Sequence, residues 1–329
     1  MKHSTSGQLS LFPEEQKPIR TNEKAKRVAW SFSRRSTLEQ CARRYYYEYY
    51  GSSKKTAKNE ENKNELYFLK HLQNRYERTG AILHLVISHY LRKMQQGETL
   101  SSNRLEGWVK KLFEKDLEIS IGYSKTTPPD GQYPPVILQE LYYDIPNALV
   151  LCHEAFDNII QALHNFYSSS IYARFRELGG KSNSLVEYSF KISKRSFRID
   201  GRIDLSYRDD KKLVIVDWKS GSKDGGGEDS LQLSTYALWG VEYYPCSSKD
   251  IEVMKAFLRE NEVVKFSVDE RLLNVAQARI SQDVERMTSL GKYGEDAIAD
   301  AFSPCGQVAV CRLCAYRRLC PEGRNVIYA

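Results

Sequence analysis

The chain has 329 residues, of which 41% are hydrophobic, and it carries 49 Lys and Arg against 42 Asp and Glu, a net charge of +7. This length and composition allow one large domain or two smaller ones with a substantial core. Charged residues interrupt the apolar stretches well short of the roughly 20 residues that a membrane span needs. The N-terminal residues form no apolar signal core. We therefore expect a cytoplasmic protein that is neither secreted nor embedded in a membrane.

The positive charge gathers near both ends of the chain. Residues 1–35 contain eight Lys and Arg against three acids, and residues 311–324 contain four Arg against one Glu. Basic segments suit a polyanionic partner such as DNA, although an ordinary solvated surface can have the same composition. Charge alone therefore permits a nucleic-acid partner without requiring one.

The N-terminal residues 1–28 are polar and contain two prolines, which indicates a flexible tail. Five residues in it form a candidate docking peptide similar to the one by which bacterial replication and repair proteins bind the sliding clamp: Gln8, Leu9, Ser10, Leu11 and Phe12. A mobile tail could offer Leu11 and Phe12 to an apolar pocket. The alternative is a chance match, and loss of clamp binding on changing both residues to Ala would decide between the two.

The first half of the chain is predicted to be mainly helical. We expect one helix over 33–51, ending at Gly51, and a second over roughly 65–97. Residues 101–178 are also mainly helical apart from a proline-rich loop at 126–135. The block from about 90 to 180 is interpreted as a helical lobe or insertion.

Period-two alternation and β-forming residues begin at residue 185. We expect strands over 185–192, 197–207 and 212–219, a helix over 231–244, a hairpin of strands 251–258 and 262–268, and a long helix over 269–290. Helices would flank a central sheet, which is an α/β or α+β arrangement.

The apolar strand 213–216 ends in the tripeptide Asp217-Trp218-Lys219. Residues two apart on a strand project to one face, so Asp217 and Lys219 point together and need partners if they are buried. Pairing across the preceding turn would bring Asp204 near Asp217. Two converging carboxylates repel unless a cation lies between them, and their oxygens suit Mg²⁺ or Mn²⁺. For an isolated Asp-x-Lys pattern, a cross-strand salt bridge is the alternative.

The run GRID…VDWKSG…LQLSTYA resembles the core of PD-(D/E)XK nucleases of the RecB type. The resemblance implies an α/β fold with a restriction-endonuclease-like core, a central mixed sheet flanked by helices, and a helical insertion. It also implies that Asp204 and Asp217 bind the metal and that Lys219 is catalytic. Gln232 and Tyr236 match the family's Gln-x-x-x-Tyr motif and would position the substrate or Lys219.

Two further site residues follow from the same resemblance. The segment Gly80-Ala81-Ile82-Leu83-His84 matches the Gly-x-x-x-His helix of the RecB-type branch, which implies that His84 is a metal ligand. A lone histidine on an apolar helix is more often a core residue, but the ordered set of motifs favours the ligand. Glu187 stands where the family often has another acid at the start of its first strand, so we include it among the catalytic candidates.

The cysteines crowd toward the C-terminus. Four of the seven are Cys305, Cys311, Cys314 and Cys320, a spacing that in a reducing cytoplasm favours metal or cluster ligation over disulfides. Sequence spacing alone makes Cys305 the fourth ligand of a zinc-ribbon-like site.

A subset of RecB-type nucleases, which includes AddB and the CRISPR-adaptation nuclease, is similar to this chain at both ends. Those nucleases hold a [4Fe–4S] cluster between one cysteine near the start and three near the end. The resemblance therefore implies Cys41, Cys311, Cys314 and Cys320 as cluster ligands, with Cys305 as a spare and zinc as the alternative metal. Such a cluster would join the chain ends across a very long loop.

Taken together, the sequence predicts one nuclease domain over 29–329: a helical lobe (about 90–180), a catalytic core (about 181–270) and a cysteine region (about 300–322, with Cys41). We expect an Mg²⁺- or Mn²⁺-dependent exonuclease that acts on DNA ends in repair, recombination or defence against foreign DNA. The alternatives are a non-catalytic DNA-binding scaffold subunit of a helicase–nuclease or clamp-associated complex, and a zinc-containing interaction protein. Because the chain lacks an ATP-binding Gly-rich Lys motif, unwinding would need a helicase subunit as partner.

Overall fold

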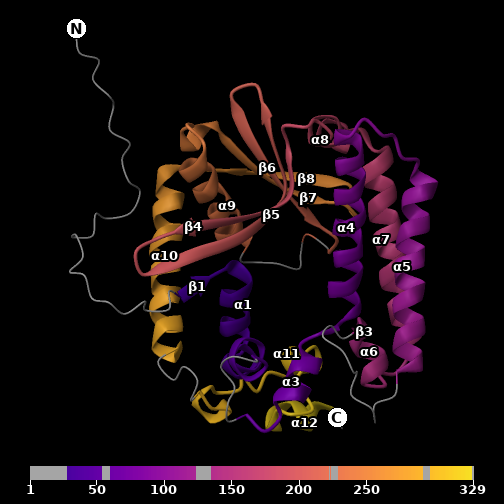
Figure 1. Ribbon diagram of the computed structural model, residues 1–329, viewed down its shortest axis with the longest axis vertical. Coiled ribbons are helices and arrows are strands. Elements are labelled where there is room, and N and C mark those ends of the chain that lie inside the picture. Colours follow the sequence, from indigo (N-terminus) through magenta and orange to yellow (C-terminus); the bar gives the residue numbers. More distant parts are fainter. Residues whose placement is uncertain are drawn as a thin grey trace.

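The computed structural model describes residues 28–53, 60–123, 135–221, 223, 229–291 and 297–327. Within these ranges a mixed sheet lies between two groups of helices (Figure 1), which confirms the predicted α/β architecture. The candidate clamp peptide at residues 8–12 lies outside the described residues, so its docking stays a prediction. Among the helices in these ranges, none combines the length and apolarity of a transmembrane span.

Six strands form the main sheet in the described part of the chain. They are β1 (Val28–Trp30), β4 (Leu185–Ser193), β5 (Phe197–Asp209), β6 (Lys212–Lys219), β7 (Ile251–Phe257) and β8 (Glu262–Ser267). The order is β1-β5-β6-β7-β8, and β4 also pairs with β5. The pairs β1–β5 and β6–β7 are parallel, whereas the other pairs are antiparallel. The predicted strands and both predicted hairpins are confirmed.

Helices cover both faces of this sheet. One face carries α4 (Arg75–Gln95), α5 (Ser102–Gly122), α7 (Ala148–Ser168) and α8 (Ala173–Gly179), and the other carries α9 (Asp229–Tyr243) and α10 (Glu270–Gly291). Figure 1 shows α4, α7 and α5 side by side as one layer. A short two-stranded sheet, β2 (Leu72–Gln73) with β3 (Ile137–Leu138), lies at the start of α4 together with α6 (Gln139–Tyr142) and contacts the neighbouring helices of this layer.

The two ends of the described chain pack together below the sheet (Figure 1). The N-terminal part comprises α1 (Phe32–Gln40), α2 (Ala42–Tyr46), the π-helix η1 (Tyr47–Gly51) and α3 (Lys63–Leu69). The C-terminal part comprises α11 (Val308–Arg312) and α12 (Pro321–Ile327). Tyr316 links the two, because its ring packs 5.4 Å from that of Tyr47 and its hydroxyl donates to Glu48 at 2.8 Å.

Strand β6 is buried on both faces, as expected for a central strand. Leu213 and Ile215 pack in the core beneath α9, whereas Val214, Val216 and Trp218 pack in the core beneath α4, α7 and α8. Continuing this alternation puts the residues at positions 217 and 219 on the α9 face. The charged side chains of Asp217 and Lys219 therefore lie on one side of the sheet.

The sheet is interrupted along one edge of β5. Strand β4 runs along β5 from residue 198 to 206, so β1 and β6 must share the other edge. On that edge β1 pairs with residues 197–199 and β6 with residues 205–209. In the described register, residues 200–204 therefore have no neighbouring strand there, and Asp204 stands at the end of this gap.

Two predicted helices are wrong as continuous elements. The helix expected over 33–51 is broken at Cys41, whose backbone is extended (φ −164°, ψ 116°) and which ends α1 and caps α2. The helix expected over 65–97 is broken before Asn74, which forms a capping box with Glu77 at the start of α4. In both places a local side-chain cap satisfies the backbone N–H groups at a new helix start.

Gly201 is required by the close approach of Phe190 across the β4–β5 hairpin. A Cβ atom at position 201 would overlap the Phe190 ring, and that ring is held by Tyr236 and Trp239, with centroids 6.4 and 5.7 Å away. The ring therefore has little freedom to move aside.

We expect Gly201→Ala to lower the free energy of unfolding by about 1–3 kcal/mol, the usual cost of overpacking a core. Chemical denaturation followed by circular dichroism measures this. Gly107→Ala is the matched control, because its Cβ meets nothing within 4 Å on the exposed face of α5 and should raise stability by roughly 0.5–1 kcal/mol. Equal stability of Gly201→Ala and the native protein would contradict the packing argument.

Candidate active site

A cavity of about 760 Å³ opens where the sheet is interrupted. Its walls come from the β1–α1 junction, from α4, from the β4–β5 hairpin, from the end of β6 and from α9. The predicted site residues that line it are His84, Asp204, Asp217, Lys219, Gln232 and Tyr236. Segments more than 100 residues apart in the sequence thus meet at one place.

Three of the predicted residues converge tightly enough to hold one cation. The Nδ1 atom of His84 lies 3.3 Å from Oδ1 of Asp204 and 3.5 Å from Oε1 of Glu187. One ligand atom from each of the three residues lies within 4.8 Å of the other two. Asp217 is outside this compact group, although the sequence names it as a metal ligand and assigns Glu187 a lesser part.

The backbone of Trp218 orients two of these side chains. Nε2 of His84 donates to the Trp218 carbonyl oxygen at 3.1 Å, and the Trp218 N–H donates to Oδ2 of Asp204 at 2.8 Å. These bonds leave Nδ1 of the histidine and Oδ1 of the aspartate facing each other. A hydrogen bond on the distal ring nitrogen is the usual way in which proteins fix the tautomer of a metal-binding histidine.

Glu187 reaches the site from a strained backbone. Its φ of 48° lies in the left-handed region, within the otherwise regular strand β4. By the register of β4 and β5 it stands opposite Asp204, but these two residues do not form a regular pair. Such a conformation costs of order 1–3 kcal/mol and is typical of functional sites. Among the described residues, its buried Oε1 accepts no hydrogen bond, while Oε2 pairs with Nε of Arg202 at 3.0 Å.

Asp217 is the centre of a second group, formed with Lys219 and two residues of α9. Oδ2 of Asp217 lies 2.8 Å from Nζ of Lys219. Oδ1 accepts from the Tyr236 hydroxyl at 3.1 Å and from Nε2 of Gln232 at 3.3 Å. Gln232 also donates to the Tyr236 hydroxyl at 2.9 Å, and its Oε1 accepts from Lys219 at 3.1 Å. The four side chains therefore fix one another.

The electrostatics of the cavity favour a bound positive charge. Burial lowers the pKa of His84, but the Asp204 carboxylate, assisted by Glu187 and Asp217, raises it by more, to about 10. Burial and the nearby Asp204 carboxylate raise the pKa of Asp217. The carboxylates thus destabilise one another's charge, and a proton on His84 partly relieves the repulsion when no metal ion does.

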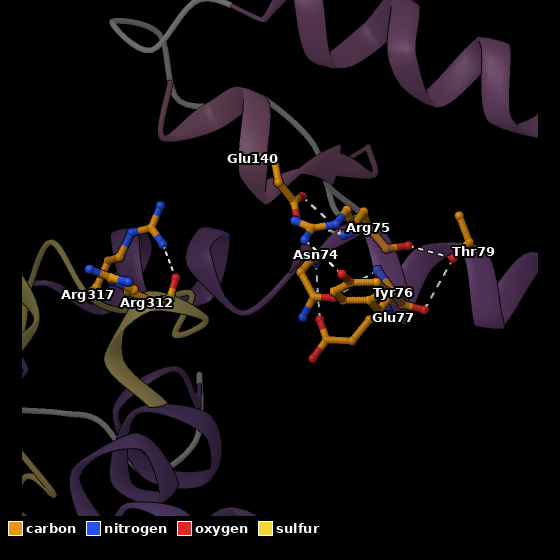
Figure 2. A network of polar contacts seen from close by, with 8 residues as sticks. All are labelled: Asn74, Arg75, Tyr76, Glu77, Thr79, Glu140, Arg312 and Arg317. Atoms are coloured by element: carbon orange, nitrogen blue, oxygen red, sulfur yellow. Dashed lines mark hydrogen bonds and ion pairs between the residues drawn. The ribbon is translucent and has the colours of Figure 1, made fainter. Parts of the chain in front are cut away.

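The start of α4, the helix that carries His84, is firmly held (Figure 2). The Asn74 side chain accepts from the Tyr76 and Glu77 N–H groups at 3.0 Å each, and the Asn74 N–H donates to the Glu77 carboxylate at 3.2 Å. The Arg75 N–H donates to both oxygens of the buried Glu140 carboxylate at 3.1 Å, and its guanidinium pairs with the same carboxylate at 3.0 Å. This fixes the helix, and with it the backbone of His84.

The cysteines form a separate site where the chain ends meet. Five of them line one small cavity: Cys41, Cys305, Cys311, Cys314 and Cys320. Cys305, which the sequence left as a spare, lies in this cavity and influences the thiols of both Cys41 and Cys311. Burial raises the pKa of Cys41, and it raises that of Cys311 to about 11 and that of Cys314 to about 12. Without a metal these three thiols therefore stay protonated at neutral pH.

The surroundings of the cysteines suit an anionic centre. The Arg44 N–H donates to the Cys41 sulfur at 3.4 Å, and the Tyr316 backbone partly offsets the rise that burial causes in the pKa of the Cys314 thiol. Three arginines line the same cavity: Arg43, Arg44 and Arg317. Hydrogen bonds to sulfur and nearby cations stabilise thiolates bound to a metal or to an iron–sulfur cluster.

Sequence reasoning missed mostly backbone groups and the residues that hold the site residues in place. The Trp218 peptide group has no sequence signal, because any residue at that position offers the same N–H and C=O. Arg202, which pairs with Glu187, lies inside the GRID motif and could have been suspected from its position two residues before Asp204. Glu140, which holds the start of α4, lies 65 residues from its partner Arg75 and gave no pattern.

The family model of the PD-(D/E)XK nuclease superfamily matches residues 29–321. No curated protein matches the chain. Among solved structures, one described as the crystal structure of SSO0001 is 16% identical, covering 65% of this chain and 96% of its own, and its TM-score of 0.29 leaves it without weight here.

We expect Mn²⁺ binding at this site to release a proton from His84. With a pKa of about 10, the ring is protonated at pH 7–8, and Nδ1 must lose that proton before it can bind a cation. Apparent affinity should therefore rise with pH, by up to about tenfold per unit, until the pH approaches that value. Titration calorimetry in buffers of different ionisation enthalpy measures the released protons.

The control for this titration is His84→Asn, which keeps a polar side chain of smaller size without a titratable ring. It should bind Mn²⁺ more weakly and release about one proton fewer than the native protein at pH 7.5. The same proton release from both proteins would show that His84 does not take part.

Proposed function

Because this chain belongs to the PD-(D/E)XK nuclease superfamily, we propose that it is a metal-dependent deoxyribonuclease that hydrolyses phosphodiester bonds at DNA ends. The observation that carries the proposal is the convergence of one imidazole and two carboxylates within 4.8 Å. Beside it in the same cavity lies the ion pair of the buried Asp217 with the half-buried Lys219. A protein with only structural salt bridges would have no need to gather four acidic and imidazole groups at a gap in its sheet.

The donor set fits a hard divalent cation. Nδ1 of His84, Oε1 of Glu187 and Oδ1 of Asp204 would hold it, and Asp217 would add charge beside them. Carboxylate ligands suit Mg²⁺ and Mn²⁺, and the imidazole shifts the preference toward Mn²⁺. When bound, such an ion supplies Lewis acidity toward the phosphate and lowers the pKa of a water molecule.

Lys219 would neutralise charge that develops on the phosphate or orient the attacking water. Its ammonium group is held 2.8 Å from Asp217 and 3.1 Å from Gln232, at the wall of the cavity. Gln232 and Tyr236 act as positioning residues, because their bonds to Asp217 fix both the carboxylate and the lysine. Lys191 and Arg202 also line the cavity and can contact the DNA backbone.

The finer assignment rests on the RecB-type resemblance. Relatives that carry a histidine at the position of His84 often act on free ends, so exonuclease activity in DNA repair, recombination or defence against foreign DNA is our proposal. A helicase subunit and the sliding clamp are the partners that we propose, the clamp through residues 8–12. The seven unpaired thiols suit a reducing compartment such as the cytoplasm.

At the cysteine site we propose a [4Fe–4S] cluster held by Cys41, Cys311, Cys314 and Cys320. Support comes from the Arg44 N–H that donates to the Cys41 sulfur and from the arginines that line the cavity. The cluster would join the segment after α1 to the C-terminal segment, which already pack together through Tyr316. Its role in this proposal is structural.

For the nuclease, we expect Asp217→Asn and Lys219→Ala each to slow hydrolysis by at least about a hundredfold, as loss of a charge-stabilising group does elsewhere. The assay uses anaerobically purified protein, Mn²⁺ or Mg²⁺, and DNA labelled at either the 5′ or the 3′ end. Asp209→Asn is the matched control, because this half-buried aspartate at the end of β5 pairs with Arg174 and does not line the cavity, so its loss should leave the rate unchanged. DNA binding without hydrolysis by the native protein would favour the scaffold subunit instead.

For the cluster, we expect anaerobically purified protein to contain iron and inorganic sulfide in equal amounts, and little zinc. Elemental analysis and visible absorption measure this. Cys314→Ser should lose both iron and sulfide, whereas Cys152→Ser, a change in the helical layer, should keep them. Zinc in place of iron in the native protein would overturn the proposal.

A further inference from the structure

Cys305 lies beside the four proposed cluster ligands, although the resemblance gives it no ligand role. The backbone of residues 302–305 runs beside that of residues 41–43, since the Arg43 N–H donates to the Ser303 carbonyl at 3.2 Å and Nε of Arg43 donates to that of Phe302 at 2.8 Å. Cys305 and Cys41 line the same small cavity, and Cys305 is among the groups that interact with the Cys41 thiol. The two cysteines are therefore direct neighbours.

This contact lies in the cavity where the cluster is proposed. Cys305 lines that cavity together with the four proposed ligands, and it also influences the Cys311 thiol. Cys305 is half-buried and follows Pro304, and Gly306 after it has a φ of 66° that turns the chain. Four cysteines complete the proposed site, so the thiol of Cys305 has no ligand role. Because Cys305 is only half-buried, solvent reaches this thiol.

We propose that Cys305 is a redox partner of Cys41, and that the two form a disulfide when the four-cysteine site holds neither cluster nor metal. Cys41 is the partner of choice over Cys311 because the backbone of residues 302–305 runs directly beside that of residues 41–43. This inference rests on the proposed function in one respect, namely that an iron–sulfur cluster normally occupies the site.

The reaction needs an oxidant, and a low-molecular-weight disulfide such as oxidised glutathione supplies it. The Cys305 thiolate attacks one glutathione sulfur, breaks the S–S bond and releases one glutathione thiolate, which takes up a proton. The Cys41 thiolate then attacks the mixed disulfide at the Cys305 sulfur and releases the second glutathione. In total two protein thiols lose two electrons and two protons, and one glutathione disulfide becomes two thiols.

The disulfide would replace the link between chain ends that the cluster supplies. Cys41 and Cys305 are 264 residues apart (305 − 41), so their bond closes nearly the same long loop as a cluster between Cys41 and the C-terminal cysteines. It would also remove Cys41 from the ligand set. The disulfide would have to be reduced before the cluster could be reloaded. Until then, it would protect the two cysteines of the empty site from irreversible oxidation.

The test uses the full chain after iron and zinc have been removed with a chelator under reducing, anaerobic conditions. The protein is then exposed to oxidised glutathione, and its disulfides are mapped by peptide mass spectrometry after free thiols are blocked. We expect a Cys41–Cys305 peptide as the main product. We also expect a higher melting temperature than that of the reduced metal-free protein, and dithiothreitol should reverse both.

Two variants control for general oxidation. Cys305→Ser should show no rise in melting temperature, while Cys246→Ser, which removes another half-buried thiol remote from this cavity, should behave like the native protein. A main product that joins Cys41 to Cys311, Cys314 or Cys320, or Cys305 found only as a mixed disulfide with glutathione, would overturn the proposal.

Alkylation of the cluster-loaded chain supplies a second test. Iodoacetamide should modify Cys305 and spare Cys41, and the bound iron should be retained. If Cys41 is modified and Cys305 is protected, then Cys305 is a ligand and the proposal fails. If the purified protein holds no iron, only the cluster assignment fails, because disulfide mapping of the metal-free chain gives its answer regardless.

Discussion

The candidate metal site depends on the backbone of one residue, Trp218, at the end of β6. The carbonyl of Trp218 accepts from His84, and its N–H donates to Asp204, so a single backbone residue sets the orientation of two of the three converging ligands. The indole is anchored on the opposite face of the sheet, with ring centroids 5.6 Å from Phe166 and 5.7 Å from Phe175. Because the side chain is locked in this core, the backbone polar groups cannot rotate away from the cavity.

The interrupted sheet explains how buried charges are tolerated there. Had β1 or β6 continued along β5, residues 200–204 would have been paired on that edge and the cavity closed. Instead, three carboxylates and one imidazole share a partly desolvated space. Burial and repulsion from Asp204 raise the pKa of Asp217, whereas attraction to the carboxylates raises the pKa of His84. Without a cation, the repulsion between the carboxylates destabilises the folded protein. A divalent cation bound there would relieve this repulsion, and the relief would contribute to its binding affinity.

Much of the architecture was predictable because strand periodicity is a local property. Alternation located the hairpins, and the spacing of two residues was enough to place Asp217 and Lys219 on one face. The break at Cys41 was not predictable, because it depends on a cap at Cys41 and on contacts with residues 302–305, far away in the sequence. The approach of Glu187 to His84 depends on a left-handed backbone at Glu187. The place of Cys305 depends on the packing of the two chain ends. The sequence names both residues but does not show these positions.

The two sites are joined mechanically through the start of α4. Arg317, beside the cysteines, stacks 3.7 Å from the ring centre of Tyr143, whose hydroxyl donates to the Ala315 carbonyl at 2.6 Å. Tyr143 follows α6, which carries the Glu140 that holds Arg75 at the first residue of α4. A more direct ion pair between Arg44 and Glu77, at 3.9 Å, is half exposed and contributes less than about 1 kcal/mol. The buried route is therefore the stronger one. A change in the cysteine segment would reach His84 through α6 and the start of α4, and this route would give the proposed cluster a physical reason to affect the candidate active site.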